Sequence, residues 1–291
     1  MNHQESNEPQ FTHTVAIASG KGGVGKSPIA VNVAISIAKN GNKVGLLDAE
    51  VYGPNCHIMM GVKSLPPPQG KTIVPALAHG VKVISMGLLV GETQPLAWRG
   101  PMLHSAIRQF VEDVDWGDID YLIVDLPPGT GDAQLSISQT LSLTGGFIVT
   151  LPQAVSIADA RRGLELFRQL HVPVLGVVEN MSHLVMPNGE RLDVFGEGGG
   201  EQLAKDTGVD FIGSVPLDPQ VRMGGDSGNP IVISQPESQA AVSLISIADA
   251  IVSISTIQAE KQQKNSIPIE IVESWSKSVV KRNLIPIITY E

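Results

Sequence analysis

The sequence predicts an α/β fold: a doubly wound, mostly parallel sheet with helices on both faces. Short apolar segments alternate with longer segments of helical spacing, which is the pattern of successive βαβ units. Apolar residues make up 42% of the 291 residues, aromatic residues only 4%, and there are 30 glycines. This aliphatic, glycine-rich composition suits buried parallel strands joined by tight turns.

The first βαβ unit is predicted near the N-terminus. Residues 14–19, Thr-Val-Ala-Ile-Ala-Ser, form an apolar segment typical of a buried strand. A glycine-rich loop, 20–25, follows, and residues 26–39 have helical spacing that ends before Gly-Asn at 41–42. Residues 43–48 are the next predicted strand, so the order is strand, turn, helix, strand.

The remaining elements continue this alternation. A segment rich in Pro and Gly, 62–80, is expected to cross the surface. The other predicted strands are 81–86, 120–125, 146–150, 173–178 and 211–215, and the other predicted helices are 103–113, 156–170 and 238–253.

Composition limits the classes of partner. The formal charge of −9 and the pI of about 5.3 argue against a protein that coats nucleic-acid backbones. The single cysteine, Cys56, cannot form an intramolecular disulfide, which favours a reducing compartment. The N-terminal residues resemble no signal peptide, and no apolar run approaches the roughly 20 residues that span a bilayer. We therefore expect a cytoplasmic protein, no nucleic-acid partner and no membrane partner.

The loop after the first strand fits the pattern Gly-x-x-x-x-Gly-Lys-Ser, between a strand and a helix, which is the context of a phosphate-binding P-loop. Its glycines let backbone N–H groups point at phosphate oxygens without obstruction by Cβ atoms. We expect Lys26 to reach the β- and γ-phosphates and Ser27 to place its hydroxyl on Mg²⁺. The predicted ATP-binding residues of the loop are Gly20, Lys21, Gly22, Gly23, Val24, Gly25, Lys26 and Ser27.

Two carboxylates end predicted strands at the sheet edge where open α/β folds bind ligands. Asp125 follows Leu-Ile-Val and is typical of the Walker B carboxylate that holds Mg²⁺ through water. Asp48 is expected beside it. A carboxylate at a strand end can also cap the next helix. The predicted metal residues are Ser27, Asp48 and Asp125.

Lys21 gives the deviant form of the loop, Lys-Gly-Gly-x-Gly-Lys-Ser. This form resembles the P-loop NTPase family of MinD, ParA, the nitrogenase iron protein and the Mrp cluster carriers. In that family the early lysine reaches across a dimer interface to the partner's nucleotide. The resemblance therefore implies an ATP-dependent homodimer, with Lys21 and Lys26 as catalytic residues. A solvated loop lysine is the alternative.

Further segments are similar to the Mrp/ApbC branch over about residues 12–255. They are Asp48-Ala-Glu-Val-Tyr-Gly-Pro54, Trp98-Arg-Gly-Pro-Met102, Asp125-Leu-Pro-Pro-Gly-Thr-Gly-Asp132, Val178-Glu-Asn-Met-Ser182, Phe195-Gly-Glu-Gly-Gly-Gly200 and Gly213-Ser-Val-Pro-Leu-Asp218. The resemblance implies that Asn180 binds the adenine edge and that 125–132 senses the γ-phosphate. It also implies an iron–sulfur cluster carrier or assembly protein that delivers clusters to apoproteins. A MinD/ParA-like dimer switch without cluster binding is the alternative.

The sequence departs from this family at two positions near the loop. Glu50 stands where an aspartate usually orients the attacking water, and its longer side chain predicts slow ATP hydrolysis. Pro28 replaces a threonine, which removes a backbone N–H and a hydroxyl near the α-phosphate and predicts weaker nucleotide binding. Glu50 is thus the third predicted catalytic residue, with Lys21 and Lys26.

The usual cluster ligands of the family, a Cys-x-x-Cys after Glu-Asn-Met-Ser, are absent. Residues 183–191 contain no cysteine, and Met186 stands at the place of the first ligand. Clusters generally need four thiolates, whereas a homodimer has only two copies of Cys56. We interpret Cys56 as a small buried residue near the switch, the γ-phosphate-sensing segment 125–132. His183 is a possible ligand. An iron–sulfur cluster is therefore a possible cofactor without identifiable ligands.

These features divide the chain into a polar leader, 1–11, a P-loop ATPase domain, 12–257, and a linker with a C-terminal tail, 258–291. The segment 258–266 is polar, which suggests the linker. Apolar residues between 271 and 280 fall on one helical face, which predicts a helix docked on its own domain. Binding of that helix to a membrane or partner is the alternative.

Overall fold

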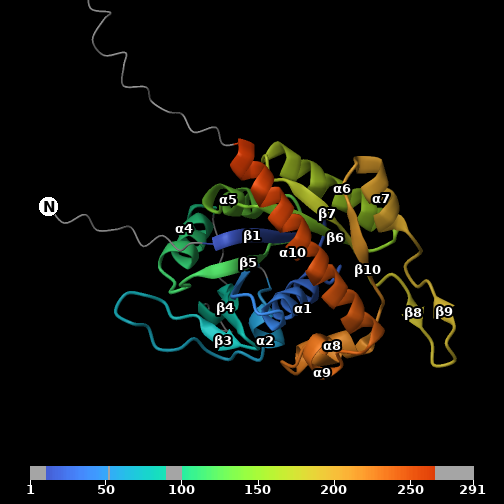
Figure 1. Cartoon of the computed structure of the whole chain (residues 1–291), viewed down its shortest axis with the longest axis horizontal. Helices are drawn as coiled ribbons and strands as arrows, with labels where there is room; N and C mark the ends of the chain where they lie inside the picture. The colour runs from blue at the N-terminus through green and yellow to red at the C-terminus, as the bar shows by residue number, and fades with distance from the viewer. Residues whose placement is uncertain (1–10, 52, 90–99, 266–291) are drawn as a thin grey trace, which may run out of the picture.

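The protein is described here by a computed structural model that covers residues 11–51, 53–89 and 100–265 (Figure 1). Its centre is an eight-stranded sheet in the order β10-β7-β6-β1-β5-β2-β4-β3. The antiparallel β3 forms one edge, and the other strands run parallel, which confirms the predicted fold class. The strands are β1 (Phe11–Ser19), β2 (Val44–Asp48), β3 (Ala76–Ala78), β4 (Val81–Ser85), β5 (Ile119–Asp125), β6 (Gly145–Thr150), β7 (Val174–Asn180) and β10 (Phe211–Val215).

Helices cover both faces of this sheet. Successive side chains of a strand point to opposite faces, so Val15 and Ile17 of β1 enter one core and Ala16 and Ala18 the other. The first core includes residues of α1 and α10, and the second includes residues of α4, α6 and α7. The helices are α1 (Lys26–Lys39), α2 (Cys56–Met59), α3 (Met86–Leu89), α4 (Gly100–Glu112), α5 (Asp132–Thr140), α6 (Ala154–Gln169), α7 (Gly199–Thr207), α8 (Pro219–Asp226), α9 (Ile231–Ser234) and α10 (Gln239–Asn265).

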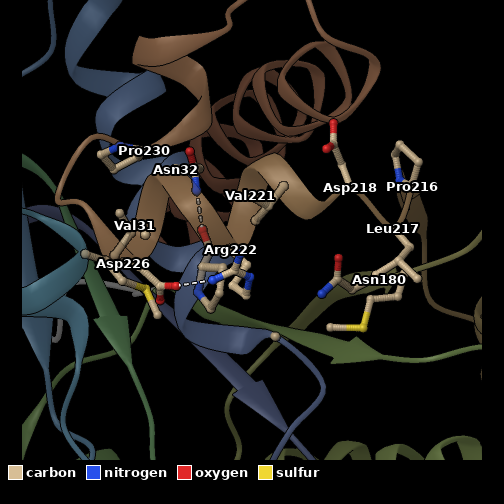
Figure 2. Close-up of a pocket in the computed structure, with 15 residues that line it drawn as sticks. Val31, Asn32, Asn180, Pro216, Leu217, Asp218, Val221, Arg222, Asp226 and Pro230 are labelled. Atoms are coloured by element: carbon tan, nitrogen blue, oxygen red, sulfur yellow. Dashed lines mark hydrogen bonds and ion pairs between the residues drawn. The ribbon is translucent and has the colours of Figure 1, made fainter. Parts of the chain in front are cut away.

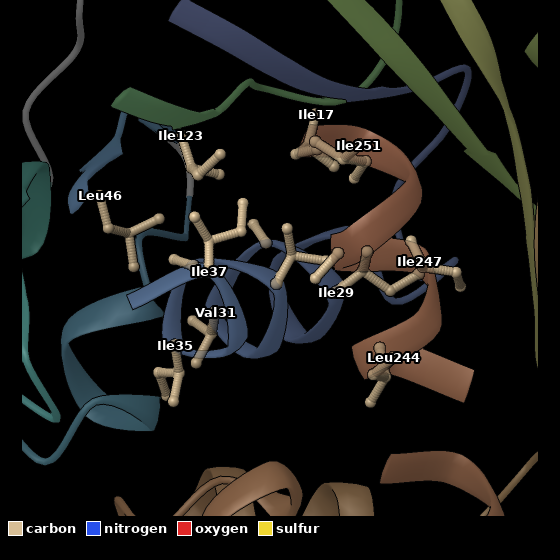
Figure 3. Packing of buried hydrophobic residues seen from close by; sticks show 14 of the residues in the cluster. Ile17, Ile29, Val31, Ile35, Ile37, Leu46, Ile123, Leu244, Ile247 and Ile251 are labelled. Atoms are coloured by element: carbon tan, nitrogen blue, oxygen red, sulfur yellow. The ribbon is translucent and has the colours of Figure 1, made fainter. Parts of the chain in front are cut away.

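The α1 core fixes the helix that follows the phosphate loop. Ile29, Val33 and Ile37 lie at intervals of four residues on α1 and are at most 1% exposed. Figure 3 shows isoleucines of α1 beside Ile17 of β1 and Ile247 of α10. Burial of a side chain of this size contributes about 1.5–3 kcal/mol. The start of α1 is therefore held by packing along the helix behind it.

The last helix corrects one predicted boundary. α10 was expected to end near residue 253, with a polar linker over 258–266, but the helix continues to Asn265. Gln, Glu and Lys are good helix formers, so the polar composition ends the buried stretch without ending the helix. The predicted tail helix over 271–280 and nearly all of the polar leader lie outside the described residues.

α10 is also long and apolar enough, over Gln239–Gln262, to cross a membrane by length and composition. In this fold it packs against α1, α9 and β10. Leu244, Ile247 and Ile251 are buried in the α1 core. A core helix passes the same length and composition test, and 39% of this window of α10 is buried in the fold.

The described part of the chain also contains a short hairpin away from the main sheet. It pairs β8 (Leu184–Val185) with β9 (Arg191–Leu192) in antiparallel register. Figure 1 shows it projecting beyond β10, at the side of the molecule.

Candidate nucleotide-binding site

The P-loop connects β1 to α1 through backbone that only glycine adopts readily. Gly23 and Gly25 have φ angles of 81° and 82°, in the left-handed region. A Cβ atom on Gly25 would lie 2.1 Å from the Asn180 amide nitrogen, and one on Gly20 would lie 2.0 Å from the Asp159 backbone. Gly25 therefore needs to be glycine both for conformation and for space, whereas Gly23 needs it for conformation and Gly20 for space.

The loop surrounds a pocket of about 320 Å³, here called the phosphate pocket. α1 begins beneath it and has no acidic residue in its first turn, so the partial positive charge of the helix N-terminus is not neutralised there. Asn55 also lines the pocket, and its side-chain oxygen is buried with no hydrogen-bond partner among the described residues. A buried polar atom without a partner is costly, which favours a polar ligand in this pocket.

The structure brings the predicted catalytic residues, and all the predicted loop residues except Gly20, to this one pocket. Its wall includes Lys21, Lys26, Ser27 and Glu50. The Lys26 ammonium donates to the Ser27 hydroxyl at 3.4 Å. The backbone N–H of Glu50 donates to the Asp48 carboxylate at 3.2 Å. Lysines and carboxylates thus meet beside a glycine-rich loop, an arrangement suited to phosphates and their metal ion.

The two predicted metal carboxylates are neighbours across the sheet. Asp48 and Asp125 end β2 and β5 and are paired in the strand register. Both are fully buried, and the Lys26 ammonium lies 2.6 Å from one oxygen of Asp125. Burial, the largest single influence, would lower the pKa of Lys26, but the charge and hydrogen bond of Asp125, together with Cys56 and Glu50, give a net upward shift. Lys26 is therefore a cation at neutral pH.

Three donors form hydrogen bonds to Asp48, but its surroundings still disfavour the ionised form of the carboxyl group. Its carboxylate accepts hydrogen bonds from the Ser85 hydroxyl at 2.7 Å and from the backbone N–H of Cys56 at 3.1 Å, besides that of Glu50. Burial, and then the neighbouring charge of Asp125, raise the pKa of Asp48 to about 7. A divalent cation between the two carboxylates would relieve this repulsion.

Cys56 belongs to the same cluster. Its predicted place near the segment 125–132 is confirmed by its hydrogen bond to Asp125, whereas its place among the potential metal ligands was not predicted. The prediction that it is buried is confirmed, since it is fully buried. Its thiol donates to Asp125 at 3.3 Å, and potential ligand atoms of Asp48, Cys56 and Asp125 lie within 4.8 Å of one another. Burial and then the two carboxylates raise the pKa of the Cys56 thiol well above its usual value. Cys56 is therefore a neutral donor in this structure.

A second pocket, of about 250 Å³, adjoins the phosphate pocket (Figure 2) and is called the nucleoside pocket here. The two share Gly25, Pro28, Met59 and Met181. Its wall is mostly apolar, and its polar side chains are Asn32, Asn180, Asp218, Arg222 and Asp226. Asn180 donates its amide to the Val24 carbonyl at 2.9 Å, which ties the end of β7 to the loop.

The sequence analysis missed most of the nucleoside pocket. Its outer wall comes from residues 216–230, between β10 and α9. The segment Gly213–Asp218 had a family resemblance but no assigned role, and Asp218 caps α8 by accepting from the Gln220 backbone N–H at 2.8 Å. Pro28 lines both pockets, at the position where the missing N–H predicts weaker binding. The size, the shape and the polar side chains of the two adjoining pockets fit a nucleotide with its metal ion.

The β8–β9 hairpin occupies the place where the family's cluster ligands are expected, and it contains no thiol. Met186 and Gly189 flank its tight turn, in which the Gly189 N–H donates to the Met186 carbonyl at 2.8 Å. His183, the possible ligand, has its ring nitrogen 3.0 Å from the Ser182 hydroxyl. The hairpin thus holds neither the usual ligand pair nor a cluster of other ligands that the structure describes.

Sequence comparisons identify relatives over most of the chain. Residues 10–252 match the ParA family model, described as NUBPL iron-transfer P-loop NTPase. An iron–sulfur cluster carrier protein of Synechocystis is 52% identical over 249 residues, 83% of this chain and 70% of that protein. The mouse iron–sulfur cluster transfer protein NUBPL is 46% identical over 242 residues, 82% of this chain and 76% of that protein.

Solved structures agree with this fold. A nucleotide-binding protein from Archaeoglobus fulgidus in complex with ADP has a TM-score of 0.68 and 35% identity, and the match covers 79% of this chain and 90% of that one. MinD from Pyrococcus horikoshii, complexed with Mg-ADP, has a TM-score of 0.64 at 21% identity, covering 85% and 99%, and shows the fold alone. The site geometry and these matches together establish that the chain belongs to the ParA/NUBPL family of iron-transfer P-loop NTPases.

Proposed function

We propose that this protein is an ATP-dependent iron–sulfur cluster carrier that acts as a homodimer, hydrolyses ATP slowly and delivers clusters to apoproteins. The observation that carries this proposal is the phosphate pocket, which is lined by the P-loop and Lys26. The buried carboxylates Asp48 and Asp125 lie beside it at the ends of β2 and β5, and Asp125 is paired with Lys26. The relatives that are named iron–sulfur cluster carrier or transfer proteins support an iron–sulfur cluster as the cargo.

Each residue of the pocket has a part in this proposal. Lys26 would exchange Asp125 for the β- and γ-phosphates, which frees Asp125 to join Asp48 and Ser27 around Mg²⁺. The ion would neutralise charge on the phosphate oxygens. Glu50 would orient the attacking water, and Lys21 would reach the nucleotide of the partner subunit. Asn180 and the nucleoside pocket would hold the base.

The cargo needs ligands beyond Cys56. The thiol is fully buried and donates to Asp125, so it is not available as an exposed thiolate. We therefore propose that thiolates of donor or client proteins complete the cluster site during transfer.

Anaerobic reconstitution with iron and sulfide tests the proposal, with absorbance and iron per dimer as readouts. The arms are the wild-type chain and Cys56→Ser, each with and without Mg-ATP, followed by incubation with apo-aconitase as a probe client. Activation of the probe by both chains supports the proposed function. Failure of both chains to speed activation of the probe overturns it, and leaves a dimer switch of the MinD type if Mg-ATP still drives dimerisation.

A further inference from the structure

Ser85 connects the metal-site carboxylates to a side chain outside the phosphate pocket. It ends β4 and is paired with Asp48 in the strand register. Besides donating to Asp48, its oxygen lies 3.1 Å from the Gly87 backbone nitrogen and 3.1 Å from Nδ1 of His57. Three strand-end residues, Ser85, Asp48 and Asp125, thus form a row across the carboxyl edge of the sheet, and His57 lies at its outer end.

The protons of this chain of hydrogen bonds have a single consistent arrangement when Asp48 is ionised. A carboxylate only accepts, so the one hydroxyl proton of Ser85 is donated to Asp48. The Ser85 oxygen then accepts from the Gly87 N–H and from His57. His57 can donate there only if its proton is on Nδ1. The imidazole is therefore oriented as a donor toward the metal site.

The position of the His57 ring is set by close packing. A Cβ atom on Gly87 would lie 2.3 Å from Cε1 of His57, so the ring lies against the glycine. His57 also lines a separate cavity of about 530 Å³ with Lys63 and Gly228, beyond the phosphate pocket. Ser85, in contrast, is fully buried. The ring is thus fixed between the surface and the buried row.

We propose that His57 is a positioning residue for Mg²⁺ binding, which orients the Ser85 hydroxyl and thereby the Asp48 carboxylate. This inference rests on the proposed role of Asp48 as a metal residue. Without His57, the Ser85 oxygen keeps only the Gly87 N–H as a donor, so the hydroxyl is less firmly fixed and donates more weakly to Asp48. Outer partners that orient metal-binding residues typically change metal affinity by 10- to 100-fold.

The first test is made on the metal-free, nucleotide-free protein. We expect ¹⁵N NMR at pH 8 to show neutral His57 with its proton on Nδ1. The His57 signals are identified by their absence from the spectrum of His57→Ala. A proton on Nε2 would overturn the proposal, because Nδ1 would then accept from Ser85 and Asp48 would lose the hydroxyl.

The second test uses calorimetry to measure ADP affinity at increasing Mg²⁺ concentrations. Its readout is the Mg²⁺ concentration at which half of the increase in ADP affinity is reached. His57→Ala should raise it by about 10-fold and leave ADP affinity in EDTA unchanged. His57→Asn should restore most of the loss, since its amide nitrogen can occupy the place of Nδ1. Gly87→Ala, which displaces the ring, should resemble His57→Ala.

The control variant is His79→Asn. Its ring nitrogen contacts the carbonyl of Gly228, a residue that lines the same cavity, at 3.0 Å. The hydrogen bonds of Ser85 within the described residues do not include His79. Its Mg²⁺ requirement should equal that of the wild type. An unchanged requirement in His57→Ala, or His57→Asn as weak as His57→Ala, would overturn the inference. Absence of any Mg²⁺-dependent ADP binding in the wild type would contradict the proposed function instead. The NMR measurement of the His57 tautomer would still test the hydrogen bonds from His57 through Ser85 to Asp48.

Discussion

The phosphate pocket and the β8–β9 hairpin differ in how many of the residues expected from the family this chain provides. The pocket corresponds to the family's nucleotide site, and the hairpin to the place of its cluster ligands. The pocket lies at the ends of buried strands, and the two carboxylates beside it, Asp48 and Asp125, are fully buried and hydrogen-bonded to Lys26, Ser85 and Cys56. The hairpin is two residues per strand, and Val185, Met186 and Leu192 are each at least 38% exposed. Nucleotide chemistry is thus built into the core, whereas ligands at the hairpin would depend on a few surface side chains.

The largest expected effect is a gain of iron at the hairpin. Met186→Cys with Gly189→Cys places two thiols across one tight turn. A homodimer would then offer four thiolates, and we expect about four iron atoms per dimer after anaerobic reconstitution. Gly189 has a φ of 83°, so the second cysteine strains the turn by about 1 kcal/mol.

The matched control is Met186→Cys alone, which should stay near the wild-type iron content. A wild-type chain that already binds four iron atoms per dimer would break the comparison between the two regions. So would a double variant that binds none while retaining its fold by circular dichroism.

The next effect concerns the buried pair of Lys26 and Asp125. Lys26→Ala leaves Asp125 charged and unpaired, which should lower the free energy of unfolding by about 3 kcal/mol and abolish ATP binding. Chemical denaturation and calorimetry measure the two effects. The double variant Lys26→Met with Asp125→Asn should recover most of the stability but no ATP binding.

Lys21→Ala serves as the comparison, because Lys21 is half-buried in the loop and outside this ion pair. We expect it to bind ATP as a monomer and to lose ATP-dependent dimerisation, measured by light scattering. Equal stability of Lys26→Ala and the wild type would show that Asp125 is not held as a buried charge.

The pH dependence of Mg²⁺ binding should follow Asp48. Its pKa is raised to about 7 by burial and then by Asp125, and the metal needs the ionised form. Mg²⁺ affinity in the ADP complex should fall about tenfold per pH unit below pH 7 and level off above it. The variant Asp48→Asn is the control for protonation of the nucleotide. Its Mg²⁺ affinity should lack the part of the pH dependence that comes from Asp48.

The same shift has a consequence for the metal-free protein. The folded carboxyl keeps its proton to higher pH than the unfolded one, so its contribution to stability is largest at low pH. Relative to Asp48→Asn, the free energy of unfolding should fall as pH rises from about 4 through 7. A difference independent of pH would contradict the raised pKa.

The smallest expected effect is on turnover. Glu50 lies in the phosphate pocket and is 8% exposed. Glu50→Asp should raise the ATPase rate by about 3- to 10-fold, since the shorter carboxylate suits the position of a water-orienting aspartate. Glu179→Asp is the control, because this buried carboxylate accepts from the Gly200 N–H at 2.7 Å, away from the pocket. An unchanged or lower rate in Glu50→Asp would show that its length does not limit hydrolysis.

The sequence by itself determined the alternation of strands and helices, the P-loop and the two strand-end carboxylates. These features are local: apolar runs mark buried parallel strands, and the carboxyl ends of such strands share one edge. The same argument applied to Ser85, a polar residue at the end of the strand predicted over 81–86, could have placed it in the row with Asp48. Family resemblance supplied what spacing could not, namely the dimer, the base-binding role of Asn180 and the cargo.

Only the tertiary structure brought Cys56 and His57 to the metal-site carboxylates and residues 216–230 to the nucleoside pocket. Cys56 and Asp125 are 69 positions apart, yet the thiol lies 3.3 Å from the carboxylate. Such contacts depend on where a short helix and a loop pack against the sheet edge, which no local periodicity records. The sequence showed that the chain has one thiol, and the fold placed that thiol inside the nucleotide site.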